Sequence, residues 1–418
     1  MAEDVLAEST SAPAKKSWVK SIGPGLVTAC VVIGPGSILT SSKIGATDGY
    51  SKSWVVIFAC IFMLTYTALA ARLAVVSNQS TGDLVRKYAG NWLAVLIGIG
   101  VFFIASAFQF GNNLGVHSAL TAFKEFDYWV ILFNLISLAF VFGFKDLYKK
   151  LEVLMSCFVA LMLISFAINL CFAKPDVGEF ARGLLPSGVS QLELPLLGLV
   201  GTTFVIAAAY YQSYLVRFKG WGQEDLKSGM VDARVSAILM ACITLMLMST
   251  AAAVLRGKDL GSVSDVANSL APLFGEKGRI IFCIGLFCAA FSSFIVNSMI
   301  GGFILADGLK MGSTPEDKGP RILTAAVLLV GMGVALYVIK QDVKPVAAIV
   351  AAQAVTVIAA PLMAGTLLWL TNKKEVMGDQ TNGKGMNAIA GLGFLLLLAM
   401  AGYTAFAKVL PGIKGFFS

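Results

Sequence analysis

Long apolar runs alternate with short polar segments along almost the whole chain. Eleven runs have roughly the 17–25 residues that an α-helix needs to cross a bilayer. They lie at 21–46, 54–75, 92–123, 129–144, 153–173, 196–216, 235–255, 279–304, 322–339, 345–370 and 387–409. This pattern predicts an all-α membrane protein with eleven transmembrane helices.

The polar segments between these runs predict the orientation of the chain. With the N-terminus inside, the cytoplasmic segments contain 19 Lys and Arg residues and the outer segments contain 12. Because basic loops stay in the cytoplasm, we expect the N-terminus inside and, after eleven spans, the C-terminus outside. The expected units are a cytosolic tail at 1–20, a first five-helix group at 21–173, an extracellular loop at 174–195, a second five-helix group at 196–370, and a cytosolic loop with the eleventh helix at 371–418.

The first apolar run is interrupted at mid-depth by Gly34, Pro35 and Gly36. A break that faced lipid would leave backbone groups without hydrogen bonds, at a cost of several kcal/mol each, so this one must line protein or a water-filled cavity.

The two half-helix ends at this break favour ligands of opposite charge. Carbonyls at the end of the inner half-helix, near Ile33, favour a cation, and N–H groups of the outer half-helix favour an anionic group. We expect Ser37 to cap the outer half-helix and the break to bind a ligand. The alternative is a kink that only shapes packing.

Polar residues within the apolar runs complete the candidate site. The candidates from the residues alone are Gly34, Gly36, Ser37, Ser41, Lys43, Gln109, Asn112, Thr202, Thr203 and Gln353. Ser292, Ser293 and Asn297 are further polar residues in the eighth run. Each polar side chain could instead hydrogen-bond one helix to another, which is common in membrane bundles. Lys43 could pair with a substrate carboxylate or extend to the outer interface.

The composition narrows the class of protein. Hydrophobic residues make up 57% of the 418 residues and charged residues 13%, and the mean hydropathy is +0.80. A soluble domain cannot bury so much apolar surface, so the composition predicts an integral membrane protein. We expect its location to be a prokaryotic cell membrane. The net charge of +8 is assigned to cytoplasmic loops and not to nucleic-acid binding.

Catalytic and cofactor patterns do not appear in the sequence. The seven cysteines lie in apolar stretches without a CxxC pair, and His117 is the only histidine. A GxxxxGK[ST] phosphate-binding loop is absent. We therefore expect no enzyme activity, no cofactor and no resident metal. The expected partners are the lipid bilayer and a small-molecule or ion substrate, with the coupling ion left open.

The chain resembles the Nramp family of transporters along nearly all of its hydrophobic length. "GPGL" at 23–26, "GPGS" at 34–37 and "GATDGY" at 45–50 are similar to the first span of the family. "AARLAVVSNQSTGDLVRKY" at 70–88 and "GTTFVIAAAYYQS" at 201–213 are similar to the loop after the second span and to the sixth span. The resemblance implies a LeuT-like inverted repeat of five plus five helices, with discontinuous helices 1 and 6 and one extra C-terminal helix, and alternating access.

The differences from the family pattern fall on its metal site. The family's aspartate and asparagine of the first span lie over Gly34 and Ser37, and its methionine and histidine of the sixth span lie over Val205 and Ala207. The acids that the family has in its third span are replaced here, near Gln109 and Asn112. Two positions keep the family's pattern: Gln353 is the family's glutamine of the tenth span, and Thr202 occupies the position whose backbone carbonyl faces the metal in the family. Val205 and Ala207 join the candidate substrate-binding residues. The chain is thus identified as a divergent member that lacks the family's transition-metal site.

The sequence favours a secondary transporter for a small polar organic solute that carries a carboxylate. A glycine-rich break with a half-helix N-terminus suits such a group. The first alternative is a divalent cation transporter for hydrated Mg²⁺ or Mn²⁺ without classical proton coupling. The second alternative is a membrane sensor that does not transport, or a channel-like path.

Overall fold

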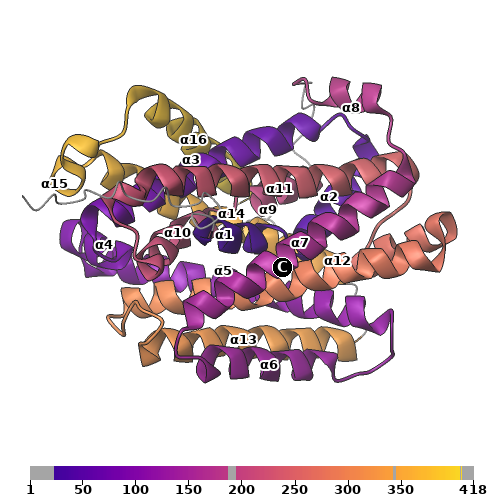
Figure 1. Ribbon diagram of the computed structural model, residues 1–418, viewed down its shortest axis with the longest axis horizontal. Helices are drawn as coiled ribbons and strands as arrows, with labels where there is room; N and C mark the ends of the chain where they lie inside the picture. The colour runs from indigo at the N-terminus through magenta and orange to yellow at the C-terminus, as the bar shows by residue number, and fades with distance from the viewer. Residues whose placement is uncertain (1–22, 187–193, 342–344, 405, 407–418) are drawn as a thin grey trace, which may run out of the picture.

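The computed structural model describes residues 23–186, 194–341, 345–404 and 406. Within these ranges every regular element is a helix (Figure 1). The α-helices are α1 (Pro24–Val32), α2 (Pro35–Asp48), α3 (Ser53–Ser77), α4 (Thr81–Ala89), α5 (Asn91–Thr121), α6 (Trp129–Gly143), α7 (Leu147–Ala173), α8 (Val177–Gly183), α9 (Leu194–Thr203), α10 (Ile206–Lys219), α11 (Leu226–Val254), α12 (Val263–Gly308), α13 (Lys318–Lys340), α14 (Pro345–Asn372), α15 (Lys374–Met377) and α16 (Lys384–Thr404).

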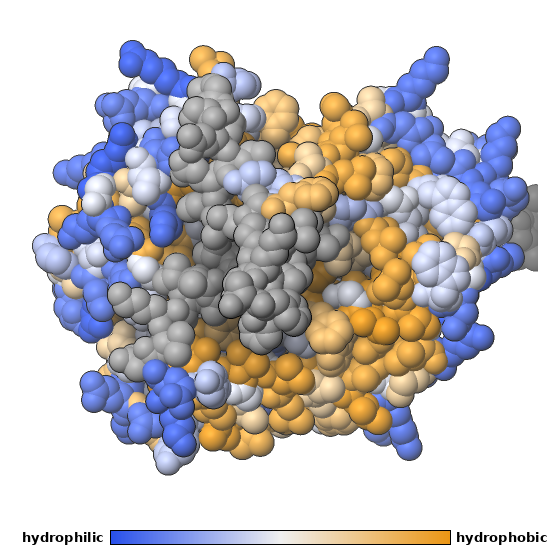
Figure 2. Space-filling model, turned by 180° about the vertical axis from the view of Figure 1, so that it is seen from behind, coloured by the Kyte–Doolittle hydropathy of each residue, from blue (hydrophilic) through white to orange (hydrophobic). Residues whose placement is uncertain are grey.

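The lengths and compositions of the helices are those of a membrane protein. Among the described residues, eight helices are long and apolar enough to cross a bilayer, or nine if the bent pair α1–α2 is one span. Helix α6 is apolar but has only 15 residues. Figure 2 shows hydrophobic residues gathered over the middle of one face, between hydrophilic residues at both ends. The predicted all-helical membrane fold is confirmed, while the number of eleven spans stays a prediction.

Both predicted breaks are present. Helix α1 ends at Val32, Gly34 is extended with φ −109° and ψ −179°, and α2 begins at Pro35 with a bend of 57° between the two helices. Proline suits this first helical position, because its missing N–H would have had no partner there. Ser37 therefore lies inside the first turn of α2, and the expectation that it caps the helix is wrong. The second break separates α9 from α10 at Phe204 and Val205.

Helix α12 forms the centre of the helix packing. It packs against α5, α13 and α7, while α2 packs against α11. Helix α12 bends at Gly275, where φ is 70°, before it runs through the core to Gly308. The segments 217–234 and 256–278, which lie between predicted spans and were expected to be loops, are largely helical. Helix α11 begins at Leu226 and α12 begins at Val263. The expected extracellular loop at 174–195 contains the short helix α8.

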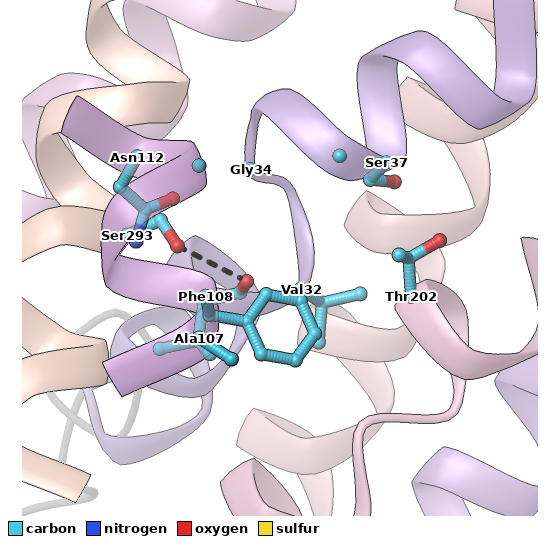
Figure 3. Close-up of a pocket in the computed structure, with 11 residues that line it drawn as sticks. Val32, Gly34, Ser37, Ala107, Phe108, Asn112, Thr202 and Ser293 are labelled. Atoms are coloured by element: carbon cyan, nitrogen blue, oxygen red, sulfur yellow. Dashed lines mark hydrogen bonds between the residues drawn. The ribbon is translucent and has the colours of Figure 1, made fainter. Parts of the chain in front are cut away.

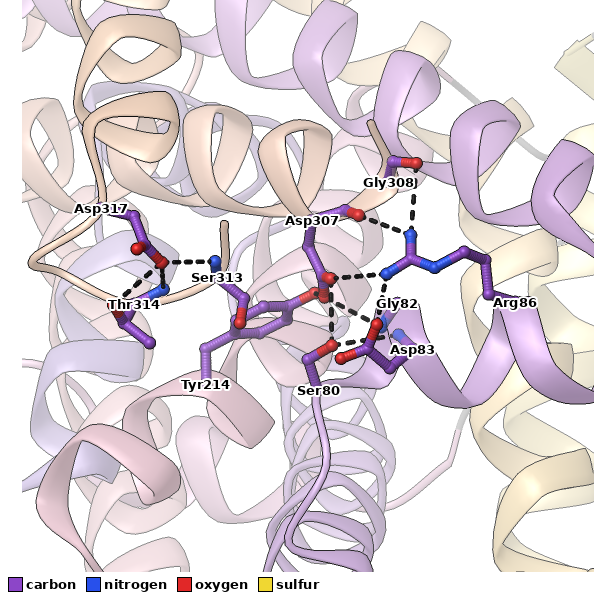
Figure 4. Close-up of polar contacts among 10 residues, drawn as sticks. All are labelled: Ser80, Gly82, Asp83, Arg86, Tyr214, Asp307, Gly308, Ser313, Thr314 and Asp317. Carbon is purple, nitrogen blue, oxygen red and sulfur yellow. Dashed lines mark hydrogen bonds and ion pairs between the residues drawn. The ribbon is translucent and has the colours of Figure 1, made fainter. Parts of the chain in front are cut away.

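Two buried carboxylates anchor the half-helices α1 and α10. Asp232 of α11 accepts hydrogen bonds from the backbone N–H groups of Gly23, at 2.9 Å, and Gly25, at 2.7 Å, at the start of α1. Asp307, near the end of α12, accepts a hydrogen bond from the Tyr214 hydroxyl of α10 (Figure 4). Asp232 lies just before the predicted span 235–255 and Asp307 just after the predicted span 279–304, so the apolar pattern gives no sign that either carboxylate is buried.

Candidate functional site

A small cavity lies at the break between α1 and α2 (Figure 3). Its volume is about 20 Å³. A cavity of at least about 10–15 Å³ is needed to hold one water molecule, so this one accommodates a single water or a bare ion. Its lining residues are Val31, Val32, Gly34, Gly36, Ser37, Ala107, Phe108, Gly111, Asn112, Thr202 and Ser293.

The polar groups around this cavity are neutral oxygens and amides. Asn112 and Ser293 lie on one side of Gly34, and Ser37 and Thr202 lie on the other (Figure 3). The Ser293 hydroxyl donates to the Val31 carbonyl at 3.4 Å. The Ser37 hydroxyl is buried and has no hydrogen-bond partner among the residues that the structure describes. Because none of the described lining residues has a carboxylate or ammonium group, a ligand here would interact with the dipoles of these residues.

Helix ends contribute to the electrostatics of the cavity. Val31 and Val32 lie in the last turn of α1, where backbone carbonyls have no partner within the helix and carry partial negative charge. Thr202 lies near the end of α9, and its hydroxyl donates to the Gly198 carbonyl at 2.9 Å and lies 3.3 Å from the Thr40 hydroxyl. The C-terminal ends of α1 and α9 therefore approach the cavity and favour a cation, whereas the N-terminal end of α2, which contributes Gly34, Gly36 and Ser37, favours an anionic group.

Five of the twelve predicted residues line this cavity, namely Gly34, Gly36, Ser37, Asn112 and Thr202. Val205 and Ala207 instead line a second cavity of about 20 Å³ at the break between α9 and α10, next to Phe108. The two cavities share Phe108, which lines both of them.

The other predicted residues lie outside both linings. Ser41 and Thr203 are buried, and within the described part of the chain their hydroxyl groups have no hydrogen-bond partner. Gln109 lines neither cavity, and its side-chain oxygen accepts a hydrogen bond from the Asn112 side-chain nitrogen at 3.4 Å. Lys43 is half-buried. Gln353 belongs to α14, and its side chain lies outside the part of the chain that the structure describes.

Ser293 is the polar lining residue that sequence reasoning did not place at the break. The pair Ser292–Ser293 in an apolar run was a visible signal, but periodicity alone does not say which helix a residue will face. Among the described residues, no group of three or more His, Cys, Asp and Glu side chains could hold a metal ion. A metal at the break would therefore be bound by neutral oxygens.

Comparisons with known proteins agree on one family and one fold. Residues 25–407 match the family described as natural resistance-associated macrophage protein-like, Nramp. A divalent metal cation transporter, MntH, of Pectobacterium carotovorum is 24% identical over 417 residues, which cover 95% of this chain and 96% of that one.

Two solved structures show the fold. A manganese transporter of Eremococcus coleocola, crystallised with an aromatic bis-isothiourea substituted compound, matches with a TM-score of 0.83 and 19% identity, over 98% of this chain and 91% of that one. MhsT in complex with L-phenylalanine matches with a TM-score of 0.56 and 15% identity, over 93% of this chain and 100% of that one. These likenesses confirm the predicted LeuT-like fold.

Proposed function

Because the chain belongs to the Nramp family, we propose that it carries a divalent metal cation across the membrane by alternating access. The single observation that carries this proposal is the cavity of about 20 Å³ at the α1–α2 break. Sites for organic ligands usually have volumes of about 300–1,000 Å³. The cavity and the relatives both favour the cation, so the organic carboxylate that the sequence favoured is replaced by its first alternative.

The lining chemistry favours a hard cation such as Mg²⁺ or Mn²⁺. Hydroxyl, amide and carbonyl oxygens are the ligands that these ions accept, whereas thioether and thiolate sulfur favour softer metals. The described lining of the cavity at the α1–α2 break has no sulfur. The second cavity has Val205 at the position of the family's methionine, and its one described thioether is that of Met363. Because no described lining residue supplies a carboxylate, we propose that the protein binds the cation weakly.

The third span supports transport without classical proton coupling. Gln109 and Asn112 carry amides, which neither take up nor release protons at physiological pH. We propose that neither residue relays protons, so cation transport should not require a pH gradient. We also propose the orientation that the Lys and Arg distribution favours, with the N-terminus in the cytoplasm.

Uptake into proteoliposomes tests this function. Purified protein is reconstituted around a fluorescent indicator of divalent cations, and Mg²⁺ or Mn²⁺ is added outside. We expect uptake that saturates with concentration and does not change when a protonophore collapses the pH gradient. A monodisperse reconstituted protein that moves neither ion would contradict the proposal, and uptake of a radiolabelled amino acid would restore the organic solute.

A further inference from the structure

Oxygen atoms from two helices point at the space beside Gly34. Gly34 precedes α2 and has no side chain, and a Cβ atom built on it would lie 3.1 Å from Ser293 Oγ and 3.4 Å from Asn112 Oδ1. Ser293 belongs to α12 and Asn112 to α5, and both line the cavity (Figure 3). The volume that a side chain would fill is thus faced by two neutral oxygens.

The orientation of the Asn112 amide is set by a chain of hydrogen bonds behind it. Asn297 Nδ2 donates to the Ala105 carbonyl at 2.7 Å and to Gln109 Oε1 at 3.3 Å. The same Gln109 oxygen accepts from Asn112 Nδ2 at 3.4 Å. Because the Ala105 carbonyl can only accept, Asn297 must present its nitrogen. The two longer contacts, at 3.3 and 3.4 Å, favour a Gln109 that presents its oxygen and an Asn112 that turns its nitrogen away from the cavity. Asn112 Oδ1 is therefore the atom that remains for the cavity.

The Ser293 hydroxyl oxygen, like Asn112 Oδ1, is available to bind a ligand in the cavity. Its bond to the Val31 carbonyl is 3.4 Å long, which is weak for an O–H donor. A cation between the two groups could be bound by both oxygens, because a hydroxyl has two acceptor lone pairs and the Val31 carbonyl lies at the C-terminal end of α1. Both Asn112 and Ser293 are only 2% exposed, so an ion bound there would be well shielded from water.

We propose that Asn112 Oδ1, Ser293 Oγ and the Val31 carbonyl are ligands of the transported cation. This inference rests on the proposed function and names the protein atoms that bind the ion. The ligand set is neutral and has only oxygen atoms, so it gives a soft metal such as Cd²⁺ no advantage over Mg²⁺ or Mn²⁺. Gln109 and Asn297 are positioning residues, because they act on the ion only through the orientation of Asn112.

A thiol placed at one ligand position tests the inference by a gain of binding. Ser293→Cys would put a soft ligand at the cavity, while Ser298→Cys places the same group at a buried site of the same helix that does not line the cavity. Titration of the purified proteins with CdCl₂ should show Ser293→Cys binding at least about tenfold more tightly than wild type, and Ser298→Cys unchanged. Equal Cd²⁺ affinity for wild type and Ser293→Cys, or an equal gain in Ser298→Cys, would overturn the assignment. The natural cysteines are present in every variant and give a common background.

A carboxylate of nearly the same shape tests the second ligand. Asn112→Asp would add a negative charge beside the cation, and titration with MnCl₂ should give at least about tenfold tighter binding than wild type. Asn113→Asp is the matched control, because Asn113 is equally buried but its amide contacts the Gln109 carbonyl and Asn134 of α6. The assignment of Asn112 as a cation ligand would be contradicted if monodisperse Asn112→Asp bound Mn²⁺ with unchanged affinity. It would also be contradicted if Asn113→Asp showed an equal gain in Mn²⁺ affinity.

The two proposals fail in different ways. A wild-type protein that moves no divalent cation into liposomes contradicts the proposed function, whatever the variants do. A wild type that does move cations, combined with variants whose affinities are unchanged, contradicts only the ligand assignment.

Discussion

The hydroxyl of Tyr214 donates a hydrogen bond of 2.5 Å to the Asp307 carboxylate and thereby ties the half-helix α10 to the end of α12. The same carboxylate accepts from Ser80 Oγ at 3.0 Å, from the Gly82 N–H at 2.9 Å and from Arg86 at 3.4 Å (Figure 4). Gly82 lacks a Cβ, which would collide with this carboxylate. Asp307, only 3% exposed, thus joins α10, α12 and the start of α4.

Removal of this carboxylate should destabilise the protein strongly. Asp307→Ala would leave the donors of Ser80, Gly82 and Tyr214 without their acceptor and would remove one of the two carboxylates beside Arg86, and we expect a loss of about 3–5 kcal/mol in the free energy of unfolding. Tyr214→Phe removes one hydrogen bond and should cost about 1–2 kcal/mol. Unfolding of the purified proteins in detergent measures both. Asp83→Asn is the control, since Asp83 is mostly exposed and its ion pair with Arg86 should contribute less than about 1 kcal/mol.

Close packing of α2 against α11 depends on Gly45. A Cβ atom at this position would collide with the backbone carbonyl of Met248, which cannot rotate away. Gly45→Ala should therefore lower the free energy of unfolding by about 1–3 kcal/mol through overpacking. Gly391→Ala in α16 has open space around the new methyl group and should be neutral or stabilising by up to about 1 kcal/mol. Equal thermal shifts in the two variants would mean that α2 is not held by this contact.

Loss of the Ser37 hydroxyl should leave the stability unchanged or raise it slightly. A capping serine would contribute about 0.5–2 kcal/mol, but α2 begins at Pro35, and the Ser37 hydroxyl has no partner. Ser80→Ala supplies the contrast, because Ser80 caps α4 by accepting from the Asp83 N–H and also donates to Asp307, so this variant should lose at least that amount. Thermal unfolding of the two variants distinguishes these cases. A destabilised Ser37→Ala would show that the hydroxyl has a partner after all.

A large side chain at Gly36 should abolish transport without preventing folding. Gly36 lines the cavity, which has room for about one water, and a leucine there would occupy the space that the cation needs. Gly36→Leu should therefore elute as wild type in size exclusion but show at least about a tenfold slower uptake of Mn²⁺ by proteoliposomes. Near-normal uptake would place the ion path elsewhere.

The LeuT-like arrangement was implied by the resemblance to the Nramp family. The sequence by itself determined the membrane class and the first break. These follow from local chemistry: apolar runs of bilayer length form helices, and Gly34, Pro35 and Gly36 interrupt one of them. The second break followed only from the resemblance to the family, because its residues include neither proline nor glycine between Thr202 and Ile206. The capping role of Ser37 was misjudged, because proline can begin a helix two residues earlier.

Only the tertiary structure decided which polar groups meet. Asp232 caps α1 from a segment that is 209 residues away from Gly23, and no local pattern near either residue encodes that contact. Asn112 and Ser293 were visible as polar residues in apolar helices, but helical periodicity defines a face of a helix and not the neighbour that covers it. Their convergence on Gly34 depends on how α5, α12 and the broken helix pack together. The physical reason is that a helix forms from contacts within four residues, whereas an ion site needs oxygens that packing brings together from distant segments.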